Sequence, residues 1–275
     1  MISILILTYN EEKNLTTCLK SVKWSNDIVI LDSYSTDSTI NIANAYDVRI
    51  IQRKFDNYAA QRNYGLSEIQ YKNEWVLMLD ADEVLTKELT IEIENTIKST
   101  SPDFTLFRVR RKDFFFSKWI KHAGGYPTWF GRLVRPNRIT VKRAINEEYH
   151  TDGKVGHLSE HLLHFPFNKG ISNWVSKHNQ YSSMEAELLV AEDYNKSPIQ
   201  DLWSKDPVVR RKLLKKLIYK MPGRPVLIFF SLYIFRLGFI DGKEGFVYCI
   251  LRAYYEFLIN LKVKEIRMRK IGRSI

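Results

Sequence analysis

The segment WVLMLDADE, residues 75–83, indicates the fold class, because five apolar residues of strand type run directly into a cluster of acidic side chains. Two similar transitions come earlier in the chain: residues 2–7 lead into Thr8-Tyr9-Asn10-Glu11, and a second strand predicted at residues 27–32 ends in Asp32. Segments with helical spacing lie between these runs. This alternation predicts an α/β fold with a mostly parallel sheet flanked by helices, whose ligands bind outside the carboxyl ends of the strands.

Strand-like and helix-like segments continue to alternate until about residue 104, where shorter aromatic strands begin. Helices are predicted at residues 15–22, 35–46 and 58–69, and a further strand at residues 48–52. Shorter aromatic strands are predicted at residues 104–110, 129–134 and 158–165, followed by helical spacing over residues 171–193. We therefore expect three regions, with boundaries at residues 1–100, 101–200 and 201–275.

Composition excludes several classes of protein. A chain of 275 residues that is 45% hydrophobic and 13% aromatic is too long for a disulfide-stapled miniature and too apolar to be mainly disordered. Its two cysteines, Cys18 and Cys249, both lie in apolar helical patterns, which argues against a disulfide framework and against a cysteine metal site. A chain of this kind is typical of the reducing cytosol. The apolar run at residues 2–7 is too short for the core of a signal peptide, so no export is expected.

The excess of positive over negative charge lies entirely in the last quarter of the chain. Residues 206–275 contain 16 Lys and Arg against 5 Asp and Glu, which accounts for the whole formal net charge of +11. Residues 210–220 interleave basic side chains with leucines at helical spacing. This pattern predicts a basic amphipathic helix that attracts residues 206–270 to an anionic membrane surface, at about 1 kcal/mol per basic residue near the lipid. The alternative is an exposed charged face whose apolar side packs on the sheet domain.

A second apolar segment of the tail, residues 226–235, is too short to cross a bilayer alone, because a span needs about 20 residues.

The acidic and polar side chains that follow three predicted strands are expected to meet at one sheet edge. A carboxylate there accepts hydrogen bonds from a base N–H or a ribose hydroxyl, and paired acids such as Asp80 and Asp82 hold a hard divalent cation against phosphate oxygens. Mg2+ or Mn2+ fits such oxygen ligands. Taken singly, Asp and Asn are also ordinary residues of turns and helix caps. Together they predict a site for a nucleoside diphosphate and a metal ion.

The order of these motifs resembles that of the family 2 glycosyltransferases, which have the GT-A fold. The matching motifs are Thr8-Tyr9-Asn10-Glu11, Asp32-x-x-Ser-Thr-Asp37 and Asp80-x-Asp82, with Gln61-Arg62-Asn63 between the last two. Within the family, residues 2–165 are most similar to the lipopolysaccharide core β-glucosyltransferases. The resemblance implies a nucleotide-sugar-binding half at residues 1–100, an acceptor-binding half at 101–200 and a basic helical tail.

The resemblance also implies an activity and a place in the cell. The activity is the inverting transfer of a hexose, glucose in this branch, from a UDP-sugar to a membrane-associated glycan such as lipopolysaccharide core. The place is the cytoplasm, at the inner face of the cytoplasmic membrane. A polyprenyl phosphate, a capsule saccharide or a peptide remains open as the acceptor.

Individual roles follow from the resemblance by position. The uridine part is expected to contact Thr8, Tyr9, Glu11 and Asp32, the diphosphate to lie near Arg62, and the ribose and metal to be held by Asp80 and Asp82. His164 matches a histidine of related enzymes and is expected to bind metal or phosphate, with His157 and His161 as alternatives. A histidine among apolar residues is also an ordinary hydrogen-bonded core group.

An inverting transfer further requires a base that takes the proton of the acceptor hydroxyl. Glu147 matches the acid of a Val-His-Glu motif in this branch, and Glu148 is the alternative, because only one of two neighbours on a strand faces the site. Asn146 stands where the family pattern has histidine, a departure from that pattern. Arg132 and the basic residues near it are expected to be solvent-exposed charges, with contact to an acidic acceptor as the alternative.

Two other functions fit parts of the sequence. A basic nucleic-acid-binding protein would agree with a pI of about 9.4, yet no recognised nucleic-acid motif accompanies the charge. A nucleotidyltransferase would also use Asp-x-Asp and a metal, but it usually has a glycine-rich phosphate loop after the first strand, and residues 8–12 contain no glycine. Glycosyl transfer without nucleic-acid binding is therefore the favoured interpretation.

Overall fold

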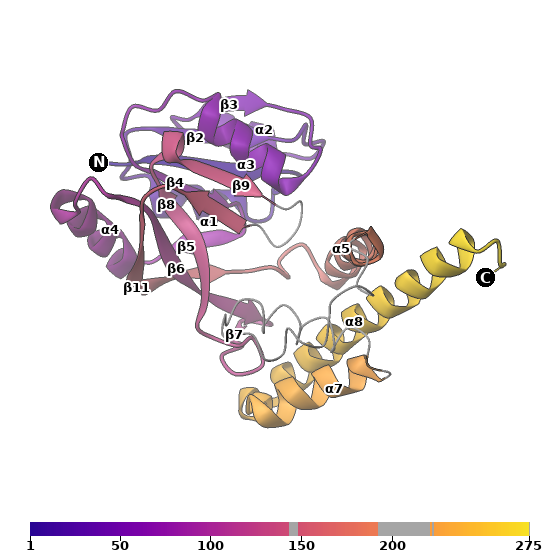
Figure 1. The fold of residues 1–275 in the computed structure, drawn as a ribbon. Coiled ribbons are helices and arrows are strands. Elements are labelled where there is room, and N and C mark those ends of the chain that lie inside the picture. Colours follow the sequence, from indigo (N-terminus) through magenta and orange to yellow (C-terminus); the bar gives the residue numbers. More distant parts are fainter. Residues whose placement is uncertain (143–147, 192–220, 222, 275) are drawn as a thin grey trace. The chain divides into compact units, whose positions relative to one another are not determined.

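The computed structural model describes residues 1–142, 148–191, 221 and 223–274 (Figure 1). The contacts within the chain divide it into two compact units. Unit 1 comprises Met1–Lys121 and Tyr126–Gly170, and unit 2 comprises His122–Gly125 and Ile171–Ile275. The boundaries predicted at residues 100 and 200 concern the roles of the regions and remain predictions.

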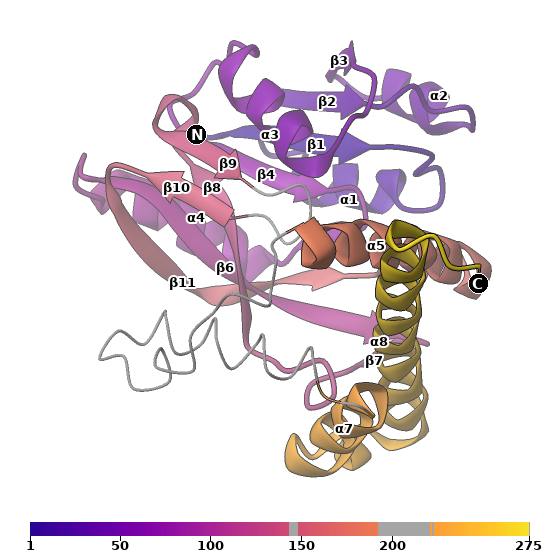
Figure 2. The same cartoon turned by 45° about the vertical axis from the view of Figure 1, so that its right-hand side comes forward.

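Unit 1 is built on a mixed sheet with the strand order β3-β2-β1-β4-β8-β6-β11-β5 in the part of the chain that the structure describes. The strands are β1 (Ser3–Thr8), β2 (Ile28–Asp32), β3 (Arg49–Gln52), β4 (Val76–Asp80), β5 (Glu83–Leu85), β6 (Phe104–Phe115), β8 (Thr128–Val134) and β11 (Lys154–His164). Strands β1 to β4 run parallel, as do β6 and β11, whereas β8 is antiparallel to β4 and β6, and β5 to β11. Figure 2 shows the parallel strands side by side.

Three short strands complete the sheets of unit 1. Strand β7 (Lys118–Trp119) pairs with β6, and β9 (Ile139–Lys142) pairs with β10 (Glu148–Thr151) in a separate two-stranded sheet.

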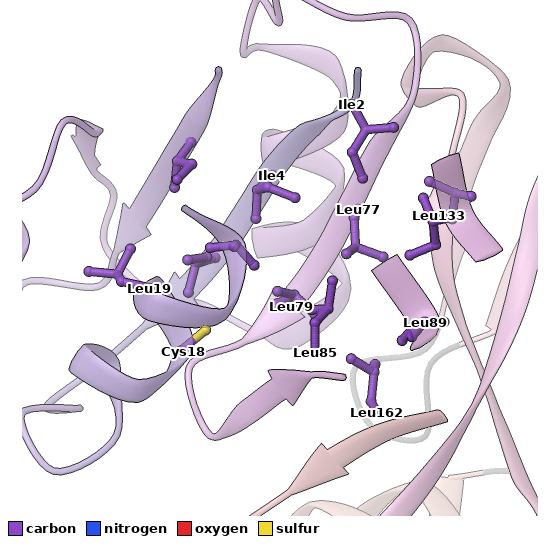
Figure 3. Packing of buried hydrophobic residues seen from close by; sticks show 14 of the residues in the cluster. Ile2, Ile4, Cys18, Leu19, Leu77, Leu79, Leu85, Leu89, Leu133 and Leu162 are labelled. Carbon is purple, nitrogen blue, oxygen red and sulfur yellow. The ribbon is translucent and has the colours of Figure 1, made fainter. Parts of the chain in front are cut away.

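Each face of the main sheet has its own hydrophobic core, because successive side chains of a strand point to opposite faces. On one face Ile4 and Leu77 pack with α1 (Leu15–Val22), α2 (Thr39–Asn44) and α4 (Lys87–Ser99), as Figure 3 shows for part of this cluster. On the other face Leu5 and Met78 pack with α3 (Tyr58–Ser67) and β9. The central strands are therefore apolar throughout, as is typical of strands covered on both faces.

Side-chain caps begin two of the covering helices. Asn57 Oδ1 accepts a hydrogen bond of 2.9 Å from Ala60 N at the start of α3, and Thr86 Oγ1 accepts one of 3.1 Å from Leu89 N at the start of α4. Such a cap stabilises a helix by about 1 kcal/mol. Arg62 is among the buried residues of α3.

The predicted fold class is confirmed, although several element boundaries differ from those predicted, most clearly the start of α2. The helix expected from Ser35 begins only at Thr39. Ser35 donates to Asp32 through its N–H and its hydroxyl, and Asp37 Oδ1 accepts from Thr39 N at 3.0 Å. These side-chain bonds hold residues 35–38 as a loop, since Ser and Asp compete with helical hydrogen bonding.

Unit 2 is helical in its described part. It contains α5 (Ile171–Ala191), α7 (Arg224–Phe230), the π-helical turn η4 (Ser231–Phe235), the 3-10 turn η5 (Gly238–Asp241) and α8 (Gly242–Lys270). Helix α8 contacts both α5 and α7. Buried Arg224 and Glu256 form an ion pair, and Lys262 Nζ donates to Asn179 Oδ1 at 2.7 Å. The basic helix predicted at residues 210–220 lies outside the described residues.

No single helix among the described residues is both long and apolar enough to cross a membrane. The segments Arg224–Phe235 and Gly238–Lys270 meet that criterion only when taken together, by length and composition alone, and they are bent by 75° relative to each other.

Candidate active site

Strand register puts three of the predicted donor-binding residues at one edge of the sheet. Thr8 of β1 is the register partner of Asp32 of β2, and Leu7 of β1 is the partner of Asp80 of β4. Adjacent strands lie about 4.8 Å apart. Thr8, Asp32 and Asp80 therefore end three neighbouring parallel strands (Figure 2), as the sequence predicts for their positions.

The Asp32 carboxylate is fully buried and hydrogen-bonded within the protein. It accepts from Thr8 Oγ1 at 2.9 Å, from the N–H and hydroxyl of Ser35, and from Gln52 Nε2 at 3.2 Å. A carboxylate has about four acceptor positions, so these four bonds fill them. A nucleotide that bonds to Asp32 must therefore displace one of the protein donors.

The loop after β1 is tied to the loop after β2. Asn10, in a left-handed conformation with φ of 53°, accepts from Thr36 N through Oδ1 at 2.7 Å, and its own N–H donates to Ser35 Oγ at 2.8 Å. The ring of Tyr9 projects into solvent, because this residue is 56% exposed. The two motifs thus form one connected surface with an exposed aromatic side chain.

Glu11 lies in a partly buried position next to a lysine that the sequence did not single out. Its carboxylate forms a 2.7 Å ion pair with Lys169 Nζ and accepts from Asn14 Nδ2 at 2.8 Å. Burial raises the pKa of the Glu11 carboxyl, and the negative charge of Asp82 raises it further. The motif after β1 and the Asp80-x-Asp82 motif are therefore close enough to interact electrostatically.

Asp80 is held between two buried arginines. Arg62 Nη2 lies 2.8 Å from Asp80 Oδ1, and Arg132 Nη2 lies 2.7 Å from Asp80 Oδ2. The expectation that Arg132 is a solvent-exposed charge is wrong, because the fully buried Glu83 also pairs with Arg132 Nη2 at 2.7 Å. Two carboxylates compensate this guanidinium, which is what permits its burial.

The ion pairs continue from Glu83 to His164. Arg111 Nη1 lies 3.5 Å from Glu83 Oε1, and Arg111 Nε lies 2.9 Å from Asp113 Oδ1. The same Asp113 oxygen lies 2.7 Å from His164 Nδ1, and His164 Nε2 lies 3.4 Å from Asp82 Oδ2. The predicted site residues Asp80 and Asp82 thus belong to one continuous network of charged side chains.

Carboxylates set the protonation state of His164. Burial and the Arg111 charge act to lower the pKa of His164, but Asp82 and Asp113 outweigh them and raise it to about 9. His164 is therefore protonated at pH 7. Among the described residues the network joins four basic and four acidic side chains; the basic ones are Arg62, Arg111, Arg132 and His164, and the acidic ones are Asp80, Asp82, Glu83 and Asp113.

Cross-strand register explains why residues so distant in sequence meet. His164 of β11 is the partner of Glu83 on β5 and of Asp113 on β6. Sequence reasoning missed Glu83, Arg111 and Asp113. One signal was present, because Arg111 and Asp113 are two residues apart on a strand and so share a face.

Of the three candidate histidines, His164 is the one beside the predicted metal residue. The His157 ring meets the Trp129 ring edge-on at 4.8 Å, and His161 Nδ1 lies 3.6 Å from Glu160. His164 also has the features of a buried, hydrogen-bonded core histidine.

Asp82 and His164 have the spacing of two ligands of one divalent ion. Ligand atoms about 2.1 Å from an octahedral or tetrahedral ion lie roughly 3.0 to 3.4 Å apart, and the distance between Asp82 Oδ2 and His164 Nε2 is 3.4 Å. The described residues contain no group of three or more His, Cys, Asp or Glu placed to hold a metal. The pair therefore fits an ion that takes its other ligands from phosphate and water, with loss of the His164 proton on binding.

The two candidate bases differ in what the structure describes. Glu147 and the neighbouring Asn146 lie outside the described residues. Glu148 begins β10 and its side chain is 55% exposed, with His150 Nε2 at 3.9 Å. The choice between Glu147 and Glu148 stays a prediction.

Comparison with known proteins defines the class of this protein. Residues 3–159, more than half of the chain, match the family described as Glycosyl transferase family 2. The chain belongs to this family, and the strand order given above is that of the predicted GT-A fold.

The relatives include proteins that match almost the whole chain. A glycosyltransferase of Rickettsia conorii described as uncharacterized is 28% identical over 96% of this chain and 90% of its own length. The lipopolysaccharide core biosynthesis glycosyltransferase LpsC of Rhizobium meliloti is 28% identical over 96% of this chain and 92% of its own. Among solved structures, S. aureus TarS is 15% identical with a TM-score of 0.48, covering 99% of this chain and 92% of its own.

Proposed function

We propose that this protein transfers a hexose, glucose as the first candidate, from a UDP-sugar to a membrane-associated glycan with inversion at the anomeric carbon. The observation that carries the proposal is the alignment of Thr8, Asp32 and Asp80 at one sheet edge, in a chain of glycosyl transferase family 2. The similarity to LpsC, a lipopolysaccharide core biosynthesis glycosyltransferase, supports lipopolysaccharide core as the acceptor class.

Donor binding is assigned to the residues around this edge. The uridine contacts Thr8, Tyr9, Glu11 and Asp32, and the exposed ring of Tyr9 is suited to stacking on a base. Asp80 accepts from the ribose while its carboxylate remains oriented by Arg62 and Arg132. Arg62 supplies positive charge near the diphosphate.

Asp82 and His164 are the residues that would hold a divalent cation, Mn2+ or Mg2+. An ion held there would supply positive charge to offset the negative charge of the departing diphosphate. Asp113 Oδ1 lies 2.7 Å from His164 Nδ1 and holds that nitrogen. The other ring nitrogen, Nε2, is therefore the one directed at Asp82. A carboxylate behind a metal-binding histidine is a common means of orienting the ring.

Glu147 is the proposed base, with Glu148 as the alternative. The acceptor oxygen attacks the anomeric carbon from the face opposite the diphosphate and forms the new C–O bond. The bond from that carbon to the phosphate oxygen breaks, the electron pair leaves with UDP, and the hydroxyl proton passes to the carboxylate.

The acceptor is proposed to be lipid-linked, with the protein peripheral on the inner face of the cytoplasmic membrane. The support is the concentration of the whole charge excess in residues 206–275, which favours contact of residues 206–270 with an anionic surface. A polyprenyl phosphate, capsule saccharide or peptide acceptor is the second candidate.

Thermal stabilisation by UDP-sugars, with and without Mn2+, tests donor and metal together. A ligand at 100 times its Kd stabilises the folded form by about 2.7 kcal/mol. UDP-glucose is expected to raise the melting temperature of the wild type more with Mn2+ than without it. In the Asp82→Ala variant we expect UDP-glucose to raise the melting temperature still, but Mn2+ to add nothing to that rise. An equal increment in that variant contradicts the metal assignment, and no stabilisation of the wild type by any UDP-sugar contradicts the donor.

Turnover of the Glu147→Gln variant tests the base, with Glu148→Gln as the matched control. We expect the first variant to bind donor normally and to lose transfer, while the second retains it. The reverse result assigns the base to Glu148.

A further inference from the structure

Unit 2 has an apolar tip where η4 meets η5. The tip is defined as residues Ile234–Ile240. Five of its seven residues are large, apolar and 45–82% exposed, namely Ile234, Phe235, Leu237, Phe239 and Ile240. Isolated exposed apolar residues are normal, but clusters of them mark surfaces that contact something other than water.

The tip is held in a defined conformation by its own unit. Asp241 is buried and its Oδ2 accepts from the N–H groups of His122 and Ala123, each at 2.8 Å, while Oδ1 lies 2.8 Å from His122 Nδ1. Leu237 has φ of 59°, which is strained for an L-residue. Such strain persists only where the surroundings over-determine the conformation, and here it presents apolar side chains to the outside.

Glycine is required at the centre of the tip. A Cβ on Gly238 would lie 2.6 Å from the Leu232 carbonyl oxygen, so only a residue without a side chain allows this close approach.

The exposed apolar surface continues from the tip along both adjoining helices, which run side by side in Figure 1. Residues 226–261 contain 14 of the 25 large hydrophobic side chains that are exposed in the described chain. On α7 these include Val226, Leu227 and Phe230, and on α8 they include Phe246, Ile250 and Phe257.

The charge of the same segment indicates which partner covers the exposed apolar surface. Residues 224–274 contain ten Lys and Arg against four Asp and Glu. Six of these ten basic residues lie at positions 262–273, towards the C-terminal end of α8, and Arg236 and Lys243 flank the tip. Anionic lipid headgroups attract this charge, whereas a second copy of the chain would bring charge of the same sign. Basic side chains beside exposed aromatic and aliphatic ones are typical of helices that lie in a membrane interface.

We infer that the tip, Ile234–Ile240, inserts into the interfacial layer of an anionic lipid bilayer and anchors unit 2 there. This inference deepens the proposed function, because it names the segment that would bring the enzyme to a lipid-linked acceptor. It differs from attraction by the basic tail in one respect: the apolar contribution persists on uncharged lipid and at high salt, where charge attraction is screened.

Vesicle binding by the full chain tests the inference. The Phe235→Ser, Ile240→Ser double variant is compared with the Phe116→Ser, Ile91→Ser double variant, whose residues are of the same types, lie in unit 1 and are 70% and 59% exposed. Sedimentation with vesicles of phosphatidylcholine and 30% phosphatidylglycerol is expected to give at least a tenfold lower partition coefficient for the tip variant. The control should stay within twofold of the wild type. Equal binding by the tip variant, or an equal loss in the control, overturns the inference.

A second measurement does not depend on the double variant folding. Both native cysteines, Cys18 and Cys249, are buried, so a polarity-sensitive fluorophore is directed to a Phe235→Cys variant and, as control, to Ile91→Cys. Vesicles should shift the emission at position 235 to the blue and not that at position 91. An unshifted label at position 235 overturns the inference.

Two further measurements distinguish this inference from contact with a second copy of the chain and from failure of the proposed function. Sedimentation velocity without lipid that shows a dimer, lost in the tip variant, assigns the surface to a second copy and overturns the inference. UDP-glucose stabilisation is measured on the same samples. Lost vesicle binding with intact donor stabilisation supports the anchor, whereas intact vesicle binding without donor stabilisation contradicts the proposed function alone.

Discussion

Replacement of Glu83 by leucine is expected to destabilise unit 1 by about 3 kcal/mol. Glu83 is fully buried and accepts from Arg132 Nη2 at 2.7 Å and from Asp80 N at 3.1 Å, with Arg111 Nη1 at 3.5 Å. Leucine has a similar size but leaves these groups without their acceptor. Removal of one partner from a buried ion pair costs about 3–5 kcal/mol.

The expected loss lies at the lower end of that range because each arginine retains another carboxylate. Arg132 keeps Asp80 at 2.7 Å, and Arg111 keeps Asp113 at 2.9 Å. The Glu83→Gln variant keeps one acceptor oxygen but loses the charge and puts an NH2 donor in place of the second oxygen, so its loss is expected to be smaller than that of leucine, about 1–2 kcal/mol.

Urea unfolding followed by tryptophan fluorescence measures the effect. With an m-value of about 1–3 kcal/mol/M, a loss of about 3 kcal/mol lowers the midpoint by roughly 1–3 M. The control is Asp103→Asn, which removes an exposed ion pair with Lys154 (3.1 Å) and is expected to cost less than about 1 kcal/mol. Equal midpoints for Glu83→Leu and Asp103→Asn would refute the view that the buried network stabilises unit 1.

Three further predictions concern the metal pair and unit 2. Asp113→Asn is expected to weaken Mn2+ binding about tenfold by calorimetry, because His164 loses the carboxylate that orients it; unchanged affinity contradicts this role. Burial lowers the pKa of His178 to about 4, so between pH 6.5 and 4 the unfolded chain binds the proton first and unit 2 loses stability as the pH falls, by about 2 kcal/mol from pH 7.5 to 5. Urea unfolding at both pH values checks this, and an equal loss in His178→Phe would contradict it. Gly238→Ala is expected to destabilise unit 2 by about 1–3 kcal/mol, because its Cβ meets the Leu232 carbonyl oxygen; an unchanged melting temperature would show that the backbone shifts freely.

Local patterns were sufficient for the order and type of the elements from β1 to β4 and for the strands β6, β8 and β11, whereas helix α4 and the short strands β5, β7, β9 and β10 were not predicted. The first strand was expected at residues 2–7 and is Ser3–Thr8, and the second was expected at residues 27–32 and is Ile28–Asp32. Apolar runs and helical periodicity are properties of neighbouring residues, so they can be read without the fold. The start of α2 was missed because Ser35 bonds to Asp32, a choice of partner that depends on the folded loop.

The sequence by itself determined that Thr8, Asp32 and Asp80 share one edge, because parallel strands joined by helices align their carboxyl ends. Only the tertiary structure decided which charges pair. Asp113 meets His164 across 51 positions of sequence, and Arg132 meets Glu83 across 49. The first contact follows from the register of the neighbouring strands β6 and β11, and the second joins β8 and β5, which are not neighbours in the sheet, so both depend on the assembled sheet of unit 1. No local pattern around a single charged residue contains that information.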